Sequence, residues 1–399
     1  MKFRSTTLTT IAISLAVLFA GAIHISATVG FFQKWIPKLA AASVVPASQP
    51  VNNANAIQVA LLLDTSNSMD GLIEQAKSQL WKILNELTRA RKDGQVPDLQ
   101  IALYEYGNSG LSAQTGYIRQ VQPFTNDMDL VSEKLFSLTT NGGEEFCGQA
   151  IYSSLNELQW GAIPSSLRLI YIAGNEPFTQ GRVPYATACS LAKEKDVIIN
   201  TIFCGNYEEG ITGHWQSGAL MGKGAYSNID QNAATAFIET PYDDKITQLN
   251  LRLNATYLAY GAEGQEYKTN QMVQDQNALK YSTANVADRA VFKSSANYSN
   301  EKWDLVDAYK RDKKILIRER ENMPDSLKQL SRDELENEIQ QLAQERESIN
   351  QEIRELGEKR RAYLEAETEK DTAKTENSLG ASILKALREQ AKKKGFVIE

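Results

Sequence analysis

The sequence predicts an α/β protein with a doubly wound, mainly parallel sheet, followed by an α-helical, coiled-coil-like arm. Three observations predict this fold. Continuous apolar runs recur at 57–63, 167–173 and 197–203, as expected for strands that are buried on both faces. Segments with helical periodicity separate these runs. Beyond about residue 304 the chain becomes highly charged, with apolar residues at heptad spacing.

Length and composition limit the class of protein. The chain has 399 residues, which is enough for two folded units. Hydrophobic residues make up 42% and charged residues 23%, which excludes a disordered or multi-span protein. The formal net charge is -6, so no nucleic-acid partner is expected. The two histidines, His24 and His214, exclude an HExxH zinc site.

The first residues predict export. Lys2 and Arg4 precede an apolar run at 11–25, and Ala20-Gly21-Ala22 suits a signal peptidase. Residues 1–27 are therefore a cleaved signal peptide or, as the alternative, an uncleaved membrane anchor supported by the aromatic residues at 31–35. Both interpretations place the main body in the periplasm or cell envelope. Residues 28–55, rich in Ala, Val, Pro, Ser and Asn, form a linker.

Strands and helices alternate between residues 56 and 240, which we take as one domain. The expected strands lie at 57–63, 99–106, 117–124, 167–173, 197–203 and 226–229. The expected helices lie at 72–87, 127–138, 148–160 and 184–195. This alternation predicts a mainly parallel sheet with helices on both faces, whose binding crevice lies at the carboxyl ends of the strands.

The remaining chain divides into an extension of uncertain fold at 241–303 and a helical region at 304–399. Ser331 and Glu334 form a capping box that begins a helix over 330–364. Its narrow apolar seam fits a coiled coil or helical hairpin, with Arg346 and Arg360 loosening the pairing. A single amphipathic helix lying on another helix fits equally well. Because the seam is so narrow, we expect that the helix can be removed without unfolding the first domain.

Three cysteines allow two interpretations. An odd number in an exported chain indicates one disulfide with a free thiol, or three buried thiols. We predict one disulfide formed by Cys204 with either Cys189 or Cys147.

The chemically most informative segment follows the first buried strand. Asp64, Ser66 and Ser68 leave the tip of this strand and lead into a helix. Hard divalent ions prefer oxygen ligands, and two hydroxyl groups beside one carboxylate can converge on one ion at such a turn.

The run at 61–69 (LLLDTSNSM) resembles the first metal-binding loop of von Willebrand factor A domains, and the resemblance covers about residues 56–237. It implies a metal-ion-dependent adhesion site in which Ser66 and Ser68 bind the metal directly and Asp64 binds directly or through water. The family's second loop usually supplies a threonine, where this chain has Glu144. Its third loop usually supplies an aspartate, where this chain has Asn175.

The resemblance therefore implies a variant metal site of Asp64, Ser66, Ser68, Glu144 and Asn175 that takes Mg²⁺, or Mn²⁺ or Ca²⁺. One carboxylate is gained and one is lost relative to the family pattern. The alternatives are a solvated acidic turn at 144–145, a turn role for Asn175, and a fold that has kept its shape while its metal site decayed.

The expected function is non-enzymatic, metal-dependent protein binding in adhesion or assembly, in which an acidic residue of a protein partner completes the metal site. The sequence has no Walker-type phosphate loop and no nucleophile elbow. The main alternative is a structural adaptor whose helical arm mediates assembly. An accessory subunit of a cytoplasmic ATPase is a third class, which the export signal disfavours. Membrane contact is expected only through the N-terminal segment.

Overall fold

The computed structural model describes residues 53–229, 238–370 and 379–398. The expected signal peptide or anchor and the linker up to residue 52 lie outside the described residues. Within those ranges, no helix combines the length and apolarity that a membrane span needs.

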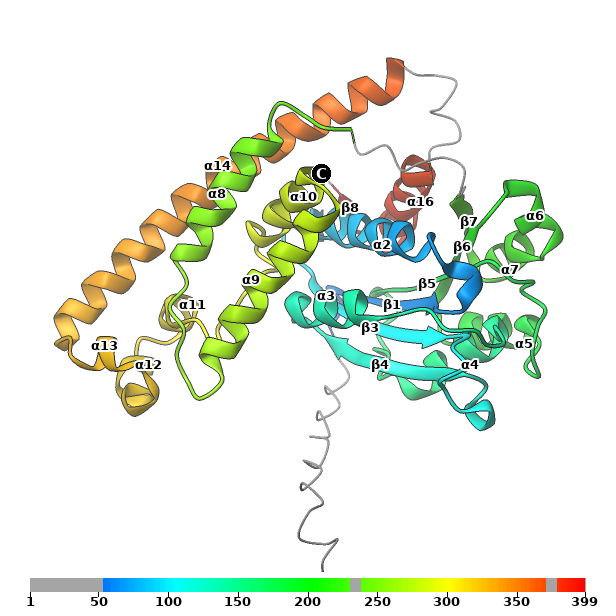
Figure 1. The fold of residues 1–399 in the computed structure, drawn as a ribbon, viewed down its shortest axis with the longest axis horizontal. Helices are drawn as coiled ribbons and strands as arrows, with labels where there is room; N and C mark the ends of the chain where they lie inside the picture. Colours follow the sequence, from blue (N-terminus) through cyan, green and yellow to red (C-terminus); the bar gives the residue numbers. More distant parts are fainter. Residues whose placement is uncertain (1–52, 230–237, 371–378, 399) are drawn as a thin grey trace, which may run out of the picture. The chain divides into compact units, whose positions relative to one another are not determined.

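The centre of the fold is a six-stranded sheet in the order β4-β3-β1-β5-β6-β7 (Figure 1). Neighbouring strands are parallel except for β4, which is antiparallel to β3 at one edge. The strands are β1 (Ala56–Asp64), β3 (Asp98–Tyr106), β4 (Ile118–Thr125), β5 (Leu167–Gly174), β6 (Ile198–Cys204) and β7 (Lys223–Ile229). The predicted doubly wound, mainly parallel sheet is confirmed.

Both faces of the sheet are covered, which explains the unbroken apolar runs. In β1, Ile57 and Leu61 belong to the core on one face, and Ala60 and Leu62 to the core on the other. The first face carries α2 (Ile73–Thr88), α3 (Met128–Ser137) and α16 (Leu379–Lys393). The second carries α4 (Cys147–Glu157), α5 (Tyr185–Glu194) and α7 (Trp215–Met221), with the short α6 (Tyr207–Thr212) beside α7.

The C-terminal segment completes the core of this domain. Ile383 and Leu387 of α16 are buried in the same cluster as Leu84 of α2. After α16, β8 (Val397–Ile398) pairs antiparallel with β2 (Ala90–Arg91), which directly follows α2. The boundaries at 240 and 303 stay a prediction, but the last residues of the chain pack on the sheet rather than in a separate arm.

Residues 241–303, whose fold the sequence pattern does not predict, are mainly helical. The helices are α8 (Asp243–Ala255), α9 (Gly264–Tyr281) and α10 (Thr283–Lys293), followed by α11 (Leu305–Arg311), α12 (Ile315–Arg318) and α13 (Asp325–Lys328). Helix α9 has no apolar stripe because it buries the polar side chains of Gln271, Gln274 and Asp275. Hydrophobic periodicity therefore gives no signal there.

Helix α14 (Arg332–Lys370) is continuous, and its start matches the predicted capping box. The Ser331 backbone N–H donates to Glu334 Oε2 at 2.7 Å, and the Glu334 N–H donates to Ser331 Oγ at 3.3 Å. The seam of α14 is buried against α8, α10 and α11 of the same chain, which is the helix-on-helix alternative (Figure 1).

The two seam arginines of α14 are bound to carboxylates rather than exposed. Arg346 Nη1 lies 2.6 Å from Asp304 Oδ2, and its guanidinium stacks 4.1 Å from the ring centre of Tyr257. Arg360 Nε lies 2.6 Å from Asp243 Oδ1. The expectation that these arginines loosen the seam was wrong, because buried charges with hydrogen-bonded partners hold helices in a defined register.

The predicted disulfide is also wrong, since all three described thiols are free and buried. The Cys147 thiol lies 3.6 Å from the Tyr106 hydroxyl, and the Cys189 thiol lies 3.6 Å from the Gly218 carbonyl oxygen. Burial raises the pKa of Cys189 to about 11 and that of the other two further. The second interpretation of the cysteines, three small buried residues, is the correct one.

Candidate metal site

The loop after β1 is held in place by backbone hydrogen bonds. The Thr65 N–H donates to the Tyr106 carbonyl oxygen at 2.9 Å, which ties the loop to the end of β3. The Met69 N–H donates to the Ser66 carbonyl oxygen at 3.1 Å and closes a short 3₁₀ turn at Asn67–Met69. Because Met69 is buried in the core beneath the loop, its side chain anchors the turn. This anchoring fixes the directions of the hydroxyl groups in the loop.

Four of the five expected side chains come together at the carboxyl ends of β1 and β5. Ser66 Oγ and Ser68 Oγ lie 2.7 Å apart. The Ser68 hydroxyl donates to Asn175 Oδ1 at 2.9 Å, and Asn175 Nδ2 donates back to the Ser68 carbonyl oxygen at 3.2 Å. Asp64 joins them because its Oδ1 accepts the Ser66 N–H at 2.8 Å.

Asp64 has an unsatisfied oxygen. The residue is fully buried, and its Oδ2 has no hydrogen-bond partner among the described residues. Two glycines allow the close approach of the neighbouring strands. A Cβ atom at Gly107 would lie 2.7 Å from Asp64 Oδ1, and one at Gly174 would lie 3.0 Å from Asp64 Oδ2. A buried carboxylate oxygen without a donor is costly unless a proton or a cation compensates it.

The electrostatics of Asp64 agree with this geometry. The pKa of Asp64 is raised to about 7, mainly by burial and in smaller part by the nearby Glu145 carboxylate, while hydrogen bonding from Ser66 and from the Asn175 backbone opposes the rise. Burial disfavours the charged form of a carboxyl group, and a neighbouring negative charge adds to the effect.

The second loop contributes Glu145 rather than Glu144 to this cluster. Glu144 is exposed, whereas the Glu145 side chain is buried. A Cβ atom at Gly107 would meet both Asp64 Oδ1 and, at 2.9 Å, Glu145 Cγ, so the two acidic side chains flank the same glycine. Burial raises the pKa of Glu145, the nearby Glu176 adds to the rise, and the Ser66 hydroxyl lowers it by hydrogen bonding.

Sequence reasoning missed Glu145 because two consecutive glutamates give no signal of which one points inward. Glu145 faces Asp64 because of the path that the backbone takes through the preceding glycines. A Cβ atom at Gly143 would lie 2.1 Å from the Gly107 carbonyl oxygen, so the second loop passes directly over the end of β3. The side chain two positions later is then turned toward Asp64.

The floor of the cluster is neutral. The Tyr106 hydroxyl donates to the Ala173 carbonyl oxygen at 2.9 Å, and the Cys147 thiol packs beside it. Burial raises the pKa of Tyr106 far above its usual value, so the hydroxyl stays protonated. These described residues beneath the cluster therefore carry no positive charge that could balance Asp64.

The donor set fits a hard divalent cation. It offers two hydroxyl oxygens, one amide oxygen and the carboxylates of Asp64 and Glu145, which are the ligand types that Mg²⁺, Mn²⁺ and Ca²⁺ prefer. Within the described ranges, no three His, Cys, Asp or Glu side chains gather in a metal-binding arrangement. A metal here would therefore depend on the serine hydroxyl groups as well as on carboxylates.

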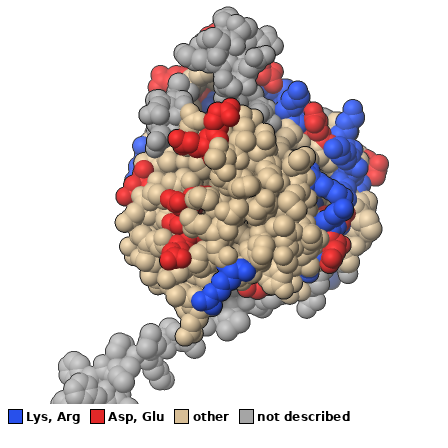
Figure 2. Space-filling view, turned by 90° about the vertical axis from the view of Figure 1, so that its right-hand side faces the viewer, with Lys and Arg blue, Asp and Glu red and all other residues tan. Residues whose placement is uncertain are grey.

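Figure 2 shows the side of the molecule toward which β1 and β3 point in Figure 1. Most of this face is uncharged. Acidic residues gather on one part of it, and lysine and arginine lie mainly along the opposite margin. A face of this kind suits protein contact better than contact with a polyanion.

The strand order, with its antiparallel edge strand β4 and the Asp64-x-Ser66-x-Ser68 loop after β1, defines the class of protein. The chain carries a von Willebrand factor A-type fold.

Comparison with solved structures finds likenesses over slightly less than half of the chain. The conserved hypothetical protein BatB from Bacteroides thetaiotaomicron is 18% identical, with 45% of this chain and 95% of that chain covered and a TM-score of 0.34. The SpRpn10 VWA domain is 15% identical, with 44% and 87% covered and a TM-score of 0.34. Proximal thread matrix protein 1 from the mussel byssus, with a zinc-occupied MIDAS motif, is 12% identical, with 46% and 44% covered and a TM-score of 0.31. No protein-family model and no curated protein matches the sequence.

Proposed function

We propose that this chain is a non-enzymatic protein-binding module of the cell envelope. Its site at the carboxyl ends of β1 and β5 binds one divalent cation, Mg²⁺ or alternatively Mn²⁺ or Ca²⁺. An acidic side chain of a protein partner completes the coordination of that cation. The ligands supplied by this chain are Ser66, Ser68 and Asn175, with Asp64 and Glu145 as the carboxylates.

The observation that carries the proposal is the unpartnered Oδ2 of Asp64. The buried Asp64 carboxylate is positioned by the Ser66 N–H and by the close approach of Gly107 and Gly174, yet its Oδ2 has no hydrogen-bond donor within the described residues. A bound cation supplies the missing positive charge and binds the same oxygens. A decayed site is therefore the weaker alternative, because without a cation the buried Asp64 oxygen would remain uncompensated.

The ligand charge of the site supports a cation. Asn175 lacks the carboxylate that the resembling family has at this position, and Glu145 supplies a carboxylate from the opposite side. The site therefore keeps two acidic side chains, although one has moved from the third loop to the second. Because this pair is buried, its repulsion favours uptake of a divalent ion.

The adaptor alternative is less well supported. It requires the apolar seam of the helical arm to be free for another chain. The seam residues Ile349 and Ile353 are instead buried in a cluster with Leu249 and Leu253 of α8. A second chain would have to displace these contacts.

The proposal is tested by thermal melting of the full chain with millimolar Mg²⁺ or Mn²⁺ and with chelator. The cation should raise the melting temperature by mass action. Glu145→Gln should weaken the rise, and Asp64→Ala should remove it. Glu144→Gln is the matched control, since it removes the same charge one residue away at an exposed position. Equal effects of the two Gln variants, or a rise that survives Asp64→Ala, would contradict the proposed ligands.

The partner is tested separately. Capture from a native envelope extract with immobilised full chain should retain one set of proteins in Mg²⁺ and release it in chelator. Asp64→Ala should retain none of that set even with Mg²⁺. Retention that is independent of both chelator and Asp64 would favour the adaptor alternative.

A further inference from the structure

The strand β7 is an edge of the sheet. It is hydrogen-bonded to β6 on one side, and no described strand lies on its other side. β7 has one extra residue relative to β6 between Lys223 and Tyr226, and Lys223 is its single charged residue, so the bulge and the charge that protect an edge both lie at its amino end. From Tyr226 to Ile229 the register is regular and the strand contains no proline. This stretch of the edge lacks those protective features and can accept another strand.

A groove of about 510 Å³ lies between this strand and the helices α6 and α7. Its lining contains no charged residue and consists of Tyr207, Ile211, Gln216, Ser217, Ala219, Leu220, Gly224 and Tyr226. Two of its apolar side chains are unusually open, with Leu220 78% exposed and Tyr207 45% exposed. Large apolar side chains this accessible, together in one groove, indicate a contact surface.

The two ends of the groove differ. Leu220 lies in the last turn of α7, which ends at Met221 just before β7 begins, so it stands at the amino end of the strand. Tyr207 follows the carboxyl end of β6, which is parallel to β7, and its ring lies 5.1 Å from that of Tyr226. The groove therefore has an aliphatic end and an aromatic end.

The charged residues also differ between the two ends of the groove. Lys223 is exposed at the amino end of β7. Glu208 is exposed on α6 and close enough to Tyr226 to raise the pKa of its hydroxyl, after the larger effect of burial. One end of the edge is thus basic and the other acidic. A strand running antiparallel to β7 with the same distribution of charge is complementary to it.

We propose that β7 pairs antiparallel with β7 of a second copy of this chain. A two-fold axis then brings the amino end of each strand beside the carboxyl end of the other. Leu220 of each copy enters the groove of the other copy beside Tyr207 and Tyr226, and Lys223 faces Glu208. The interface is isologous and closes after two copies, so it forms a dimer and not a fibre.

The pairing has a consequence for binding, and this consequence alone rests on the proposed function. Antiparallel strands point their carboxyl ends in opposite directions, so the two candidate metal sites lie at opposite ends of one continuous sheet. Such a dimer holds two partner molecules at once and gains avidity for a surface or polymer that presents many partners.

The test is the molar mass of the full chain, measured by sedimentation over a wide range of concentration. The wild type should be a dimer that dissociates on dilution. Leu220→Glu should raise the dimer dissociation constant at least about tenfold, because it removes a central apolar contact and adds a charge. Leu251→Glu is the matched control, since Leu251 is 66% exposed on α8, away from the groove. A monomeric wild type, or equal effects of the two variants, overturns the proposal.

A charge exchange tests the antiparallel register. Lys223→Glu and Glu208→Lys should each weaken the dimer, and the double variant should recover the wild-type dissociation constant within a few-fold. A double variant no better than the single ones overturns this register. Dimerisation should persist in chelator and in Asp64→Ala, which separates it from the metal site; a dimer that is lost in both would run through the metal and would also overturn the proposal.

Discussion

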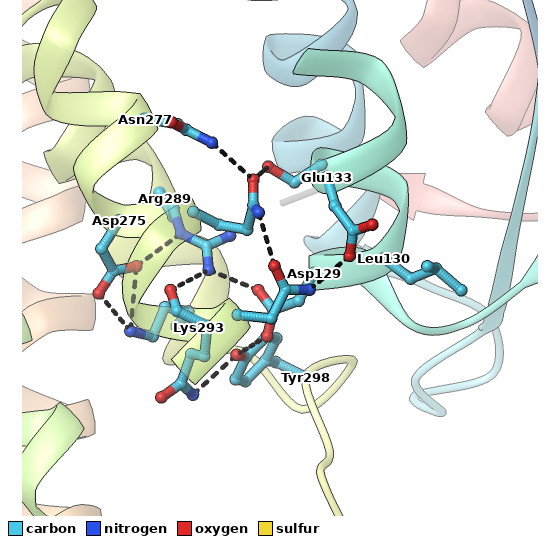
Figure 3. A network of polar contacts seen from close by, with 12 residues as sticks. Asp129, Leu130, Glu133, Asp275, Asn277, Arg289, Lys293 and Tyr298 are labelled. Carbon is cyan, nitrogen blue, oxygen red and sulfur yellow. Dashed lines mark hydrogen bonds and ion pairs between the residues drawn. The ribbon is translucent and has the colours of Figure 1, made fainter. Parts of the chain in front are cut away.

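Arg289 and Asp129 form a buried ion pair with a distance of 2.5 Å between Nη2 and Oδ1, although 160 positions of sequence separate them. Arg289 lies on α10 and Asp129 on α3, so the pair joins the helical extension to the sheet domain (Figure 3). Asp129 also accepts the Tyr298 hydroxyl at 2.5 Å, and Arg289 Nε lies 2.6 Å from Asp275 Oδ1. The two parts of the chain are therefore joined by a charged network and not only by apolar packing.

The first prediction concerns this network. Arg289→Leu leaves Asp129 and Asp275 buried with Lys293 as the remaining cation, 2.9 Å from Asp275. Because uncompensated buried charge is strongly destabilising, the free energy of unfolding should fall by about 3–5 kcal/mol. Urea unfolding measures it. Arg252→Leu, which breaks an exposed pair with Glu345, should leave the unfolding curve nearly unchanged; similar losses in the two variants would contradict the role of the network.

The second prediction concerns acid. Burial alone would raise the pKa of Asp275, but Lys293 and Arg289 together hold it well below its usual range. The folded state then binds fewer protons than the unfolded state, whose Asp pKa is about 3.9. The stabilisation is complete above that value and is lost progressively as pH falls from it toward the lower pKa of the folded state. Unfolding free energy should therefore drop below about pH 4, and Asp275→Asn should show a shallower drop. Parallel curves for the two proteins would contradict this assignment.

The third prediction concerns metal affinity. Asn175→Asp adds a carboxylate beside Ser68 and should strengthen Mg²⁺ binding by about tenfold, since ligand charge raises affinity for hard cations. Without metal the variant should melt below the wild type, because it places a third acidic group next to Asp64 and Glu145. Calorimetric titration and melting in chelator measure the two effects. Asn175→Ala is the comparison variant, and it should bind Mg²⁺ more weakly than the wild type; an unchanged affinity in both variants would remove Asn175 from the site.

The fourth prediction replaces the expectation of a removable arm. A chain that ends at Asn297 lacks α16 and leaves an opening in the core between α2 and the sheet. It should be poorly soluble or lose its cooperative melt. Leu387→Ala isolates the contribution of α16, and its cost should be about 2–5 kcal/mol because Leu387 is fully buried. Leu251→Ala, at an exposed position, should cost much less; a cooperative melt of the shortened chain would restore the separable arm.

The fifth prediction concerns the thiols. Cys147, Cys189 and Cys204 are free and buried, and the pKa of each thiol is raised by burial. Native protein should therefore react slowly with a thiol reagent at neutral pH, because the thiolate is the reactive species. Denatured protein should expose three thiols without added reductant. Mass spectrometry that finds fewer than three modified cysteines after denaturation would support a disulfide.

The sequence alone was sufficient where a structural signal is local. The apolar runs of β1, β5 and β6 followed from burial on both faces, and the start of α14 followed from the capping box of Ser331 and Glu334. The meeting of Ser66, Ser68 and Asn175 also followed, because loops at the carboxyl ends of neighbouring parallel strands must lie close together.

Only the tertiary structure decided the rest, because the deciding contacts join distant residues. Glu145 rather than Glu144 faces Asp64 because the second loop crosses the end of β3 at Gly143. Helix α9 is stabilised by polar contacts with α3, such as that of Gln274 with Ser132, so it has no apolar periodicity to detect. Arg346 looks like a defect in a heptad seam, and Asp304, forty-two positions earlier, makes it a buried contact. Periodicity reports which face of an element is buried, but the partner that satisfies a buried charge is set by the fold.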